Sequence, residues 1–393
     1  MVGSLPLAGL KVVEFTHMVM GPAVGHILAG LGAEVTRVEP TGGDQTRRLL
    51  GSGSGYFPMF NRGKASICLN LKSADGLAVA KDLCGASDVL VENFRPGALD
   101  RLGLGYEALA LSNPRLIYCS EKGFLPGPYE QRTALDEVAQ MMGGLAYMTG
   151  PPGQPLRAGA SVVDITGGMF GVIGILAALE ERHRTGTGQK VVASLFETTV
   201  YLVGQHMAQF AVTGKPAAPM PARVSAWAIY DVFRTRDEPV FIGVVTDALW
   251  EKFCRLFGLD DLWADESLRV NNQRVLARDR ILPPIREMIR QMTRAEVIAR
   301  LDGSGMPFAP IGKPEELLDD PHLAEHGLEA VMLDGGQEAR LPTIPLELNG
   351  KRMGGGAALP RPGADACAVL AGLGYEPQHI AELIAKGTVQ STE

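Results

Sequence analysis

Short apolar segments alternate with segments of helical periodicity through the N-terminal part of the chain, and this alternation limits the fold more than any other feature. Residues 10–15 (LKVVEF) and 34–38 (EVTRV) are rich in β-branched side chains and predict strands. Residues 23–31 lie between them and predict a short helix. A strand, a helix and a second strand in that order predict a parallel sheet.

The same alternation recurs further along the chain and predicts an α/β fold with a Rossmann-like, doubly wound large domain. Further helices are expected over residues 74–84, 106–111, 168–183 and 198–212, and further strands over 88–91, 115–119 and 190–195. We place the large domain at residues 1–212, completed by the C-terminal segment 336–393. A proline- and alanine-rich linker is expected at 213–224, followed by a smaller α/β domain at 225–335.

The loop after the first strand reads THMVMGP and lacks the G-x-G-x-x-G glycines that let a dinucleotide pyrophosphate approach a helix. The sequence Gly63-Lys64-Ala65 is no P-loop either, because no Ser or Thr follows the lysine. Binding of a nicotinamide cofactor is therefore disfavoured, and an oxidoreductase with an aberrant nucleotide loop stays a minor alternative.

The charge balance gives no reason to expect nucleic acid or an anionic membrane as a partner, since 37 Lys and Arg residues stand against 44 Asp and Glu residues. The most apolar stretch, residues 165–179, is about 15 residues long with four glycines, which predicts a buried helix and no membrane span. The five cysteines are widely spaced without a Cys-x-x-Cys pair. We therefore expect no metal site, no disulfide framework and a reducing, cytoplasmic setting.

Asp164 is a single carboxylate in an otherwise apolar stretch, just before Gly167 and Gly168. The simpler interpretation is a helix N-cap, because Asp is among the preferred capping residues. The functional interpretation is a partly buried nucleophile, with the glycines leaving room for a bulky ligand and the helix start holding an oxyanion. Both roles can coexist. A helix N-terminus would also keep the pKa of Asp164 low.

Nine segments follow one another in an order and spacing that resemble the class III CoA-transferases, the family of formyl-CoA transferase and of the carnitine and bile-acid CoA-transferases. The segments read LKVVEFTHMVMGP, LAGLGAEVTRVEP, GDQTR, NRGKASICLNLKS, DVLVENFRPGALDRLGLGYEAL, NPRLIYCSEKGF, DEVAQMMGGLAYMTG, VDITGGMFGVIGILAAL and HRTGTGQ. The resemblance is looser beyond Pro216.

The resemblance implies that Asp164 is a covalent nucleophile and that coenzyme A thioesters are substrates, with no tightly bound cofactor. The residues implied to contact coenzyme A are His17, Met18, Val19, Asn93, Phe94, Arg101, Leu102 and Asp136, and Lys72 is a further candidate for a phosphate contact. Each has a plainer interpretation, such as a loop histidine, a core phenylalanine or an exposed lysine at a helix start. The family also implies an interlocked homodimer of threaded rings.

Two departures from the formyl-CoA transferase pattern bear on the substrates. Val19 stands where that enzyme has a glutamine, and TGKPAAPMPARVSAW stands where it has a run of glycines. We therefore expect succinyl-CoA as donor and a short dicarboxylic acid as acceptor, and neither formyl-CoA nor oxalate. Arg47 or Arg48 is the candidate cation for the distal carboxylate, although both could equally be solvated or bind a CoA phosphate.

The implied chemistry passes through an aspartyl anhydride and an aspartyl-CoA thioester. The main alternative is an acyl-CoA racemase of the same fold, which would place a catalytic histidine directly before the aspartate of LDEVAQ. Leu135 occupies that position and disfavours racemisation. A second alternative is an acyl-CoA binding protein without catalytic activity.

Overall fold

The computed structural model describes residues 5–223 and 225–392, which divide into two compact units. The first unit combines the chain up to Pro221 with the segment from Pro321 onward, and the second covers Ala222–Asp320. The order of the units is the one predicted, but the second unit ends at Asp320 and not at 335. Strands β10 (Leu328–Met332) and β11 (Glu338–Pro342) form an antiparallel pair, and Arg62 of the first unit donates a hydrogen bond to the Pro342 carbonyl at the end of that pair.

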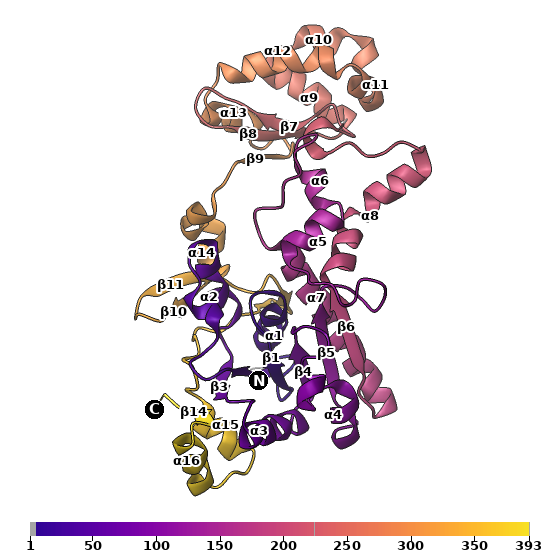
Figure 1. Cartoon of the computed structure of the whole chain (residues 1–393). Coiled ribbons are helices and arrows are strands. Elements are labelled where there is room, and N and C mark those ends of the chain that lie inside the picture. The colour runs from indigo at the N-terminus through magenta and orange to yellow at the C-terminus, as the bar shows by residue number, and fades with distance from the viewer. Residues whose placement is uncertain (1–4, 224, 393) are drawn as a thin grey trace. The chain divides into compact units, whose positions relative to one another are not determined.

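A seven-stranded sheet forms the centre of the first unit, in the order β14-β3-β2-β1-β4-β5-β6 (Figure 1). All neighbouring strands pair in parallel except β14, which runs antiparallel to β3. The chain moves outward from β1 to β3 and then from β4 to β6, which is the predicted doubly wound topology. The strands are β1 (Lys11–Phe15), β2 (Glu34–Glu39), β3 (Ala65–Leu69), β4 (Val89–Glu92), β5 (Ile117–Lys122), β6 (Lys190–Ser194) and β14 (Val389–Gln390).

Helices cover both faces of this sheet. Val12 and Val89 point to the face that packs on α1 and α7, whereas Val13 and Leu90 point to the core formed with α3, α4, α15 and α16. The helices of the first unit are α1 (Met20–Gly30), α2 (Tyr56–Phe60), α3 (Ala74–Gly85), α4 (Tyr106–Ser112), α5 (Asp136–Met142), α6 (Leu145–Thr149), α7 (Val162–Thr185), α8 (Leu195–Thr213), α14 (Pro321–His326), α15 (Ala366–Gly372) and α16 (Pro377–Ala385).

Helix α7 differs most from its prediction. It begins at Val162 and not at 168, and with 24 residues it is long and apolar enough to cross a membrane by length and composition alone, a test that the core helix of a soluble protein also passes. The expectation that this stretch is too short for a span was therefore wrong. Its glycines lie against α1, since a Cβ at Gly167 would come within 2.6 Å of the Met20 side chain. Helix α7 also packs on β5 and β6, so it is built into this unit.

The second unit is a small antiparallel sheet, in the order β7-β8-β9, with helices packed on it (Figure 1). Trp250, Phe253 and Ile285 are fully buried in its core. Its elements are β7 (Ile229–Phe233), β8 (Val240–Val244), α9 (Asp247–Phe257), α10 (Asp260–Ala264), α11 (Asn271–Leu276), α12 (Arg278–Arg290), α13 (Arg294–Leu301) and β9 (Phe308–Pro310). In the C-terminal segment of the first unit, β11 is followed by a second hairpin of β12 (Glu347–Leu348) and β13 (Lys351–Arg352).

Candidate active site

The loop between β1 and α1 is held in place by the loop that follows β4. The backbone N–H of His17 donates to Asn93 Oδ1 at 2.9 Å, and Asn93 Nδ2 donates back to the His17 carbonyl at 2.8 Å. The ring of His17 lies 5.4 Å from the ring of Phe94, tilted by 36°. Both loops follow the carboxyl ends of neighbouring strands at the point where the strand order reverses, which is where doubly wound sheets bind ligands.

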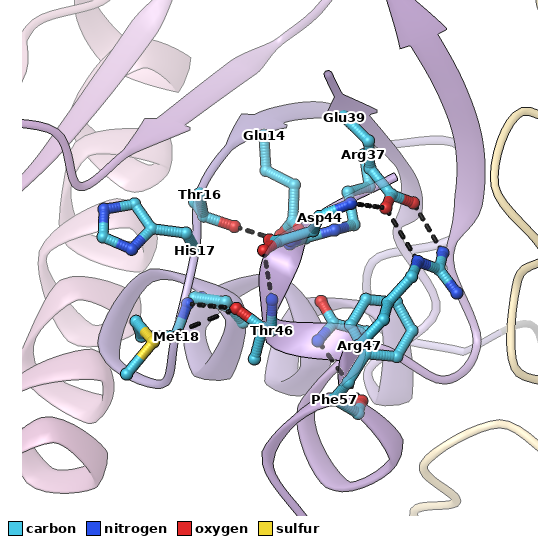
Figure 2. Close-up of polar contacts among 12 residues, drawn as sticks. Glu14, Thr16, His17, Met18, Arg37, Glu39, Asp44, Thr46, Arg47 and Phe57 are labelled. Atoms are coloured by element: carbon cyan, nitrogen blue, oxygen red, sulfur yellow. Dashed lines mark hydrogen bonds and ion pairs between the residues drawn. The ribbon is translucent and has the colours of Figure 1, made fainter. Parts of the chain in front are cut away.

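Met18 has a left-handed backbone, with φ of 62°, which is unusual for a residue other than glycine. Its N–H donates to Thr46 Oγ1 at 3.3 Å, and the Thr46 hydroxyl lies 3.9 Å from the Met18 sulfur (Figure 2). Such a conformation costs on the order of 1–3 kcal/mol and persists only where the surroundings impose it, which is common at ligand-binding loops. His17 and Met18 are exposed, whereas Val19 is buried against Ala23 and Phe60.

A buried ionic network lies beneath this loop (Figure 2). Arg37 Nη1 donates to Glu14 Oε1 and to Thr16 Oγ1, each at 3.0 Å, and Arg37 also pairs with Asp44. Lys64 Nζ is fully buried and donates to both oxygens of Glu14 at 2.8 and 3.0 Å. Because water cannot solvate these charges, each depends on its partners within the protein.

Arg47 belongs to the same network and is not a free cation. Its guanidinium makes a bidentate pair with Glu39, with Nε at 2.8 Å and Nη2 at 2.6 Å, and it lies 3.8 Å from the centre of the Phe57 ring (Figure 2). Arg47 holds the pKa of Glu39 at about 2 against the opposing effect of burial. Arg48, by contrast, is exposed and donates to the Gly42 carbonyl at 2.9 Å. Arg47 is therefore neither a solvated residue nor a cation left free for a substrate carboxylate.

Asp164 lies in the first turn of α7 and is half-buried. It is not the N-cap, a position held by Ser161, whose side chain makes no capping hydrogen bond. The cap comes from another helix, because Asp136 Oδ2 accepts from the N–H groups of Val163 and Asp164 at 2.9 and 3.1 Å. The capping interpretation of Asp164 was therefore wrong, and its carboxylate is free of that role.

The environment of Asp164 raises its pKa to about 7, mainly through burial and then through the negative charges of Asp136 and Glu137. Arg157 acts in the opposite direction. The expectation of a low pKa was wrong, because desolvation and two acidic neighbours outweigh the helix N-terminus. Carboxyl groups whose pKa is shifted toward neutral pH are common at functional sites, which makes Asp164 a candidate for one.

The nucleophile candidate and the first loop lie against each other. Val163, which precedes Asp164, packs with Met20, and Ile165, which follows it, packs with Val19. A Cβ at Gly168 would come within 2.9 Å of the Met20 carbonyl oxygen. The two glycines thus serve close packing between α7 and α1, and the space that we expected them to leave for a ligand is filled by α1.

The remaining predicted contacts divide into surface and core residues. Arg101 is exposed in the short 3₁₀ turn Asp100–Leu102, and Lys72 is exposed just before α3. Leu102 and Phe94 pack against the core on the α3 side of the sheet. The structure thus brings His17, Asn93 and Phe94 into contact, with Met18 next to them in the chain. The side chain of Leu102 packs against the core instead.

Sequence reasoning missed several charged groups around the site. Arg157 pairs with Asp136 and Glu137, and Glu121 is a fully buried carboxyl in β5 whose pKa burial raises to about 8. Among the described residues, Glu121 Oε2 has no hydrogen-bond partner. A usable signal existed for the neighbouring ionic network, since Glu14 and Arg37 fall inside the predicted strands 10–15 and 34–38, whereas Glu121 lies just beyond the predicted strand 115–119. Within residues 5–223 and 225–392 no cluster of three acidic, histidine or cysteine side chains could hold a metal.

The sheet order, the ordered loops at the reversal point and a half-buried carboxylate at a helix start define a doubly wound α/β protein with a candidate covalent site. The sequence pattern of CoA-transferase family III matches residues 7–366, and the chain belongs to that family of enzymes.

Relatives with names that state an activity extend this finding. The chain is 36% identical to an acetyl-CoA:oxalate CoA-transferase of Acetobacter aceti, over 88% of this chain and 90% of that one. It is 32% identical to a succinate–glutarate CoA-transferase of Agrobacterium fabrum, over 82% of this chain and 84% of that one. Among solved structures, a CAIB/BAIF family protein from Brucella suis superposes with a TM-score of 0.83 at 32% identity, covering 94% of this chain and 100% of that one.

Proposed function

We propose that this enzyme moves coenzyme A from an acyl-CoA donor to a free carboxylic acid, with Asp164 as the covalent nucleophile. The observation that carries the proposal is the packing of the residues on either side of Asp164 against Val19 and Met20, directly behind the exposed loop of His17 and Met18. A thioester that lies along this loop reaches a carboxylate that is partly desolvated and therefore more reactive than one in water.

The exchange needs no net proton transfer. An Asp164 oxygen attacks the thioester carbonyl, the carbon–sulfur bond breaks, and an aspartyl–acyl anhydride and a CoA thiolate form. The thiolate attacks the aspartyl carbonyl, which releases the donor carboxylate and leaves an aspartyl-CoA thioester. The acceptor carboxylate attacks this thioester and expels the thiolate, which then attacks the acyl carbonyl of the second anhydride and regenerates Asp164. Each hard step is thereby divided into easier ones.

A trapping experiment tests the intermediates. Enzyme incubated with acyl-CoA and then treated with hydroxylamine should carry a hydroxamate on the peptide that contains Asp164, because both the anhydride and the thioester react with this nucleophile. Peptide mass spectrometry identifies the modified residue. Modification of another carboxylate in place of Asp164 would refute the assignment.

His17, Met18, Asn93, Phe94 and Arg101 are proposed to bind coenzyme A, with Val19 in a supporting, buried position. Arg101 is the exposed cation of this set and pairs with a phosphate in the proposal. Arg101→Ala should raise KM for acyl-CoA by the equivalent of about 1–3 kcal/mol, with little change in KM for the acceptor acid. Steady-state kinetics with each substrate varied in turn measures this, and a larger effect on the acid would place Arg101 elsewhere. Lys72 is the weaker candidate for a second phosphate contact.

Short dicarboxylic acids are the proposed acceptors, and succinyl-CoA the proposed donor. The similarity to the succinate–glutarate CoA-transferase supports this proposal. The similarity to the acetyl-CoA:oxalate CoA-transferase makes oxalate a candidate acceptor as well, although the sequence had disfavoured it. Since Arg47 is committed to Glu39, Arg48 is the remaining candidate of the pair for the distal carboxylate. Arg48→Ala should lower kcat/KM for dicarboxylates about tenfold relative to monocarboxylates of equal length. Equal loss for both classes would exclude this role for Arg48.

A homodimer is proposed because helices α7 and α8 expose a series of large apolar side chains. These are Met169, Ile173, Leu176, Tyr201, Met207 and Phe210. A second copy of the chain is the proposed cover, threaded with the first as the family implies. Tagged and untagged dimers should then fail to exchange subunits over hours, and ready exchange would exclude the interlock. The cytoplasmic setting also remains a proposal.

A further inference from the structure

The N-terminus of α7 is capped by a side chain of α5, and this arrangement suggests how the enzyme controls its nucleophile. Asp136 is 96% inaccessible to solvent and uses one oxygen, Oδ2, for the N–H groups of Val163 and Asp164. Its other oxygen, Oδ1, accepts from Gln140 Nε2. The first turn of a helix needs such acceptors, and none comes from the side chain of Ser161.

Arg157 connects the same carboxylate to the surface. Its Nη2 lies 3.6 Å from Asp136 Oδ1, its Nη1 pairs with Glu137, and its Nε donates to the Ala158 carbonyl at 2.9 Å. Gln140 Oε1 in turn accepts from the Ala158 N–H at 2.8 Å. The chain before α7 is therefore fixed to α5 through the Arg157 side chain and the Ala158 N–H, with one cation placed between two carboxylates.

We propose that Asp136, Glu137 and Arg157 form an ionic mount for the nucleophile, in which Asp136 fixes the backbone of Asp164 and Arg157 offsets the negative charge that Asp164 experiences. Asp136 is then a positioning residue and not a contact for coenzyme A. The inference rests on the proposed nucleophilic role of Asp164. A carboxylate that must be both ionised and reactive benefits from negative neighbours, which strengthen it as a nucleophile, and from a cation, which limits its protonation.

The charged groups around Asp164 come from three elements. Helix α5 contributes Asp136 and Glu137, and the segment before α7 contributes Arg157. The third element is β5, where Asp164 raises the pKa of the buried Glu121. Helix α1 presents the apolar side chain of Met20 on this side. Of the charged groups that affect the pKa of Asp164, only Arg157 lowers it.

Charge-neutralising variants of the full-length enzyme test the mount, because the two signs of charge predict opposite shifts. Glu137→Gln and Asp136→Asn should move the acidic limb of kcat/KM for acyl-CoA to lower pH by about one unit, and Arg157→Gln should move it to higher pH by a similar amount. Asp136→Asn keeps an acceptor for the helix N–H groups, so kcat at high pH should survive, whereas Asp136→Ala should lower kcat at every pH. Glu180→Gln and Arg184→Gln, exposed on the far part of α7, are the matched controls and should shift nothing.

A second measurement tests the ionic mount independently of the proposed reaction. The free energy of unfolding of each variant is measured over a range of pH, with and without the additional substitution Asp164→Asn. The difference between the two curves reports the pKa of Asp164 in the absence of substrate. If the pKa of Asp164 shifts in opposite directions in Asp136→Asn and Arg157→Gln while the enzyme transfers no acyl group, that result would support the ionic mount and refute the nucleophilic role of Asp164. Shifts of the same sign for Asp136→Asn and Arg157→Gln, shifts no larger than the controls, or a raised KM for acyl-CoA with an unchanged pH profile would overturn the mount.

Discussion

Replacement of Asp164 by alanine is expected to abolish CoA transfer, with kcat reduced by about four orders of magnitude or more, because the covalent route has no other nucleophile. The variant should fold, since the α7 cap is supplied by Asp136 and the Asp164 side chain makes no capping bond. A discontinuous assay of acyl-CoA products measures the loss, and circular dichroism checks the fold. Full activity of Asp164→Asn without deamidation would contradict the nucleophilic role.

The same residue predicts a pH dependence of both activity and stability. The pKa of about 7 means that kcat/KM should fall about tenfold per pH unit below that value, because the nucleophile must be ionised. Folding binds the proton of Asp164 more tightly than the unfolded chain does, so its contribution to stability declines as pH rises from about 4 to 7. Asp164→Asn should therefore stabilise the protein at pH 7 more than at pH 4, as measured by urea unfolding.

Replacement of Lys64 by methionine is expected to destabilise the protein by about 3–5 kcal/mol, because it leaves buried carboxylate charge without one of its cations. Lys64 Nζ donates to both Glu14 oxygens, to the Pro22 carbonyl at 2.9 Å and to Asn61 Oδ1 at 3.3 Å, so four hydrogen-bond contacts disappear together. Since Pro22 lies at the start of α1, the loop of His17 and Met18 should also loosen and raise KM for acyl-CoA. Urea unfolding with a constant m-value measures the change in stability.

The chain offers a matched control for this substitution. Lys386 forms an ion pair with Asp75 at 3.1 Å, but both side chains are about half exposed, so Lys386→Met should cost less than about 1 kcal/mol. A double variant, Glu14→Gln with Lys64→Met, should recover part of the stability lost in the single variant. Equal effects of Lys64→Met and Lys386→Met would show that the buried network contributes nothing beyond an ordinary surface pair.

The first unit shows which parts of the fold can be predicted from local pattern. The strands near residues 11–15 and 34–39 were predicted within one residue at each end, because both are short segments rich in β-branched residues and a glycine lies shortly before each of them. The start of α7 was missed because Gly167 and Gly168 suggested a break before the helix. They are tolerated inside it since close packing on α1 compensates for their low helix propensity.

The site was predicted in part. The grouping of His17, Asn93 and Phe94 followed from the family resemblance, and their contact is now visible as two reciprocal hydrogen bonds and a ring contact. The role suggested for Arg47 was not supported, because nothing in the local sequence indicates that Glu39, at the end of β2, turns its carboxylate to that guanidinium. Sequence shows which residues carry charge, but not which charges are paired.

The sequence by itself determined the alternation of strands and helices, and through it the parallel, doubly wound sheet and the edge at which we expect a ligand, because these depend on periodicities that span a few residues. Only the tertiary structure decided the environment of Asp164, the proposed nucleophile. Asp136 lies 28 residues before Asp164 in the chain and yet caps its helix, and together with burial it raises the pKa of Asp164. Desolvation and Coulomb interactions depend on distances in space, and those distances exist only once the chain has folded.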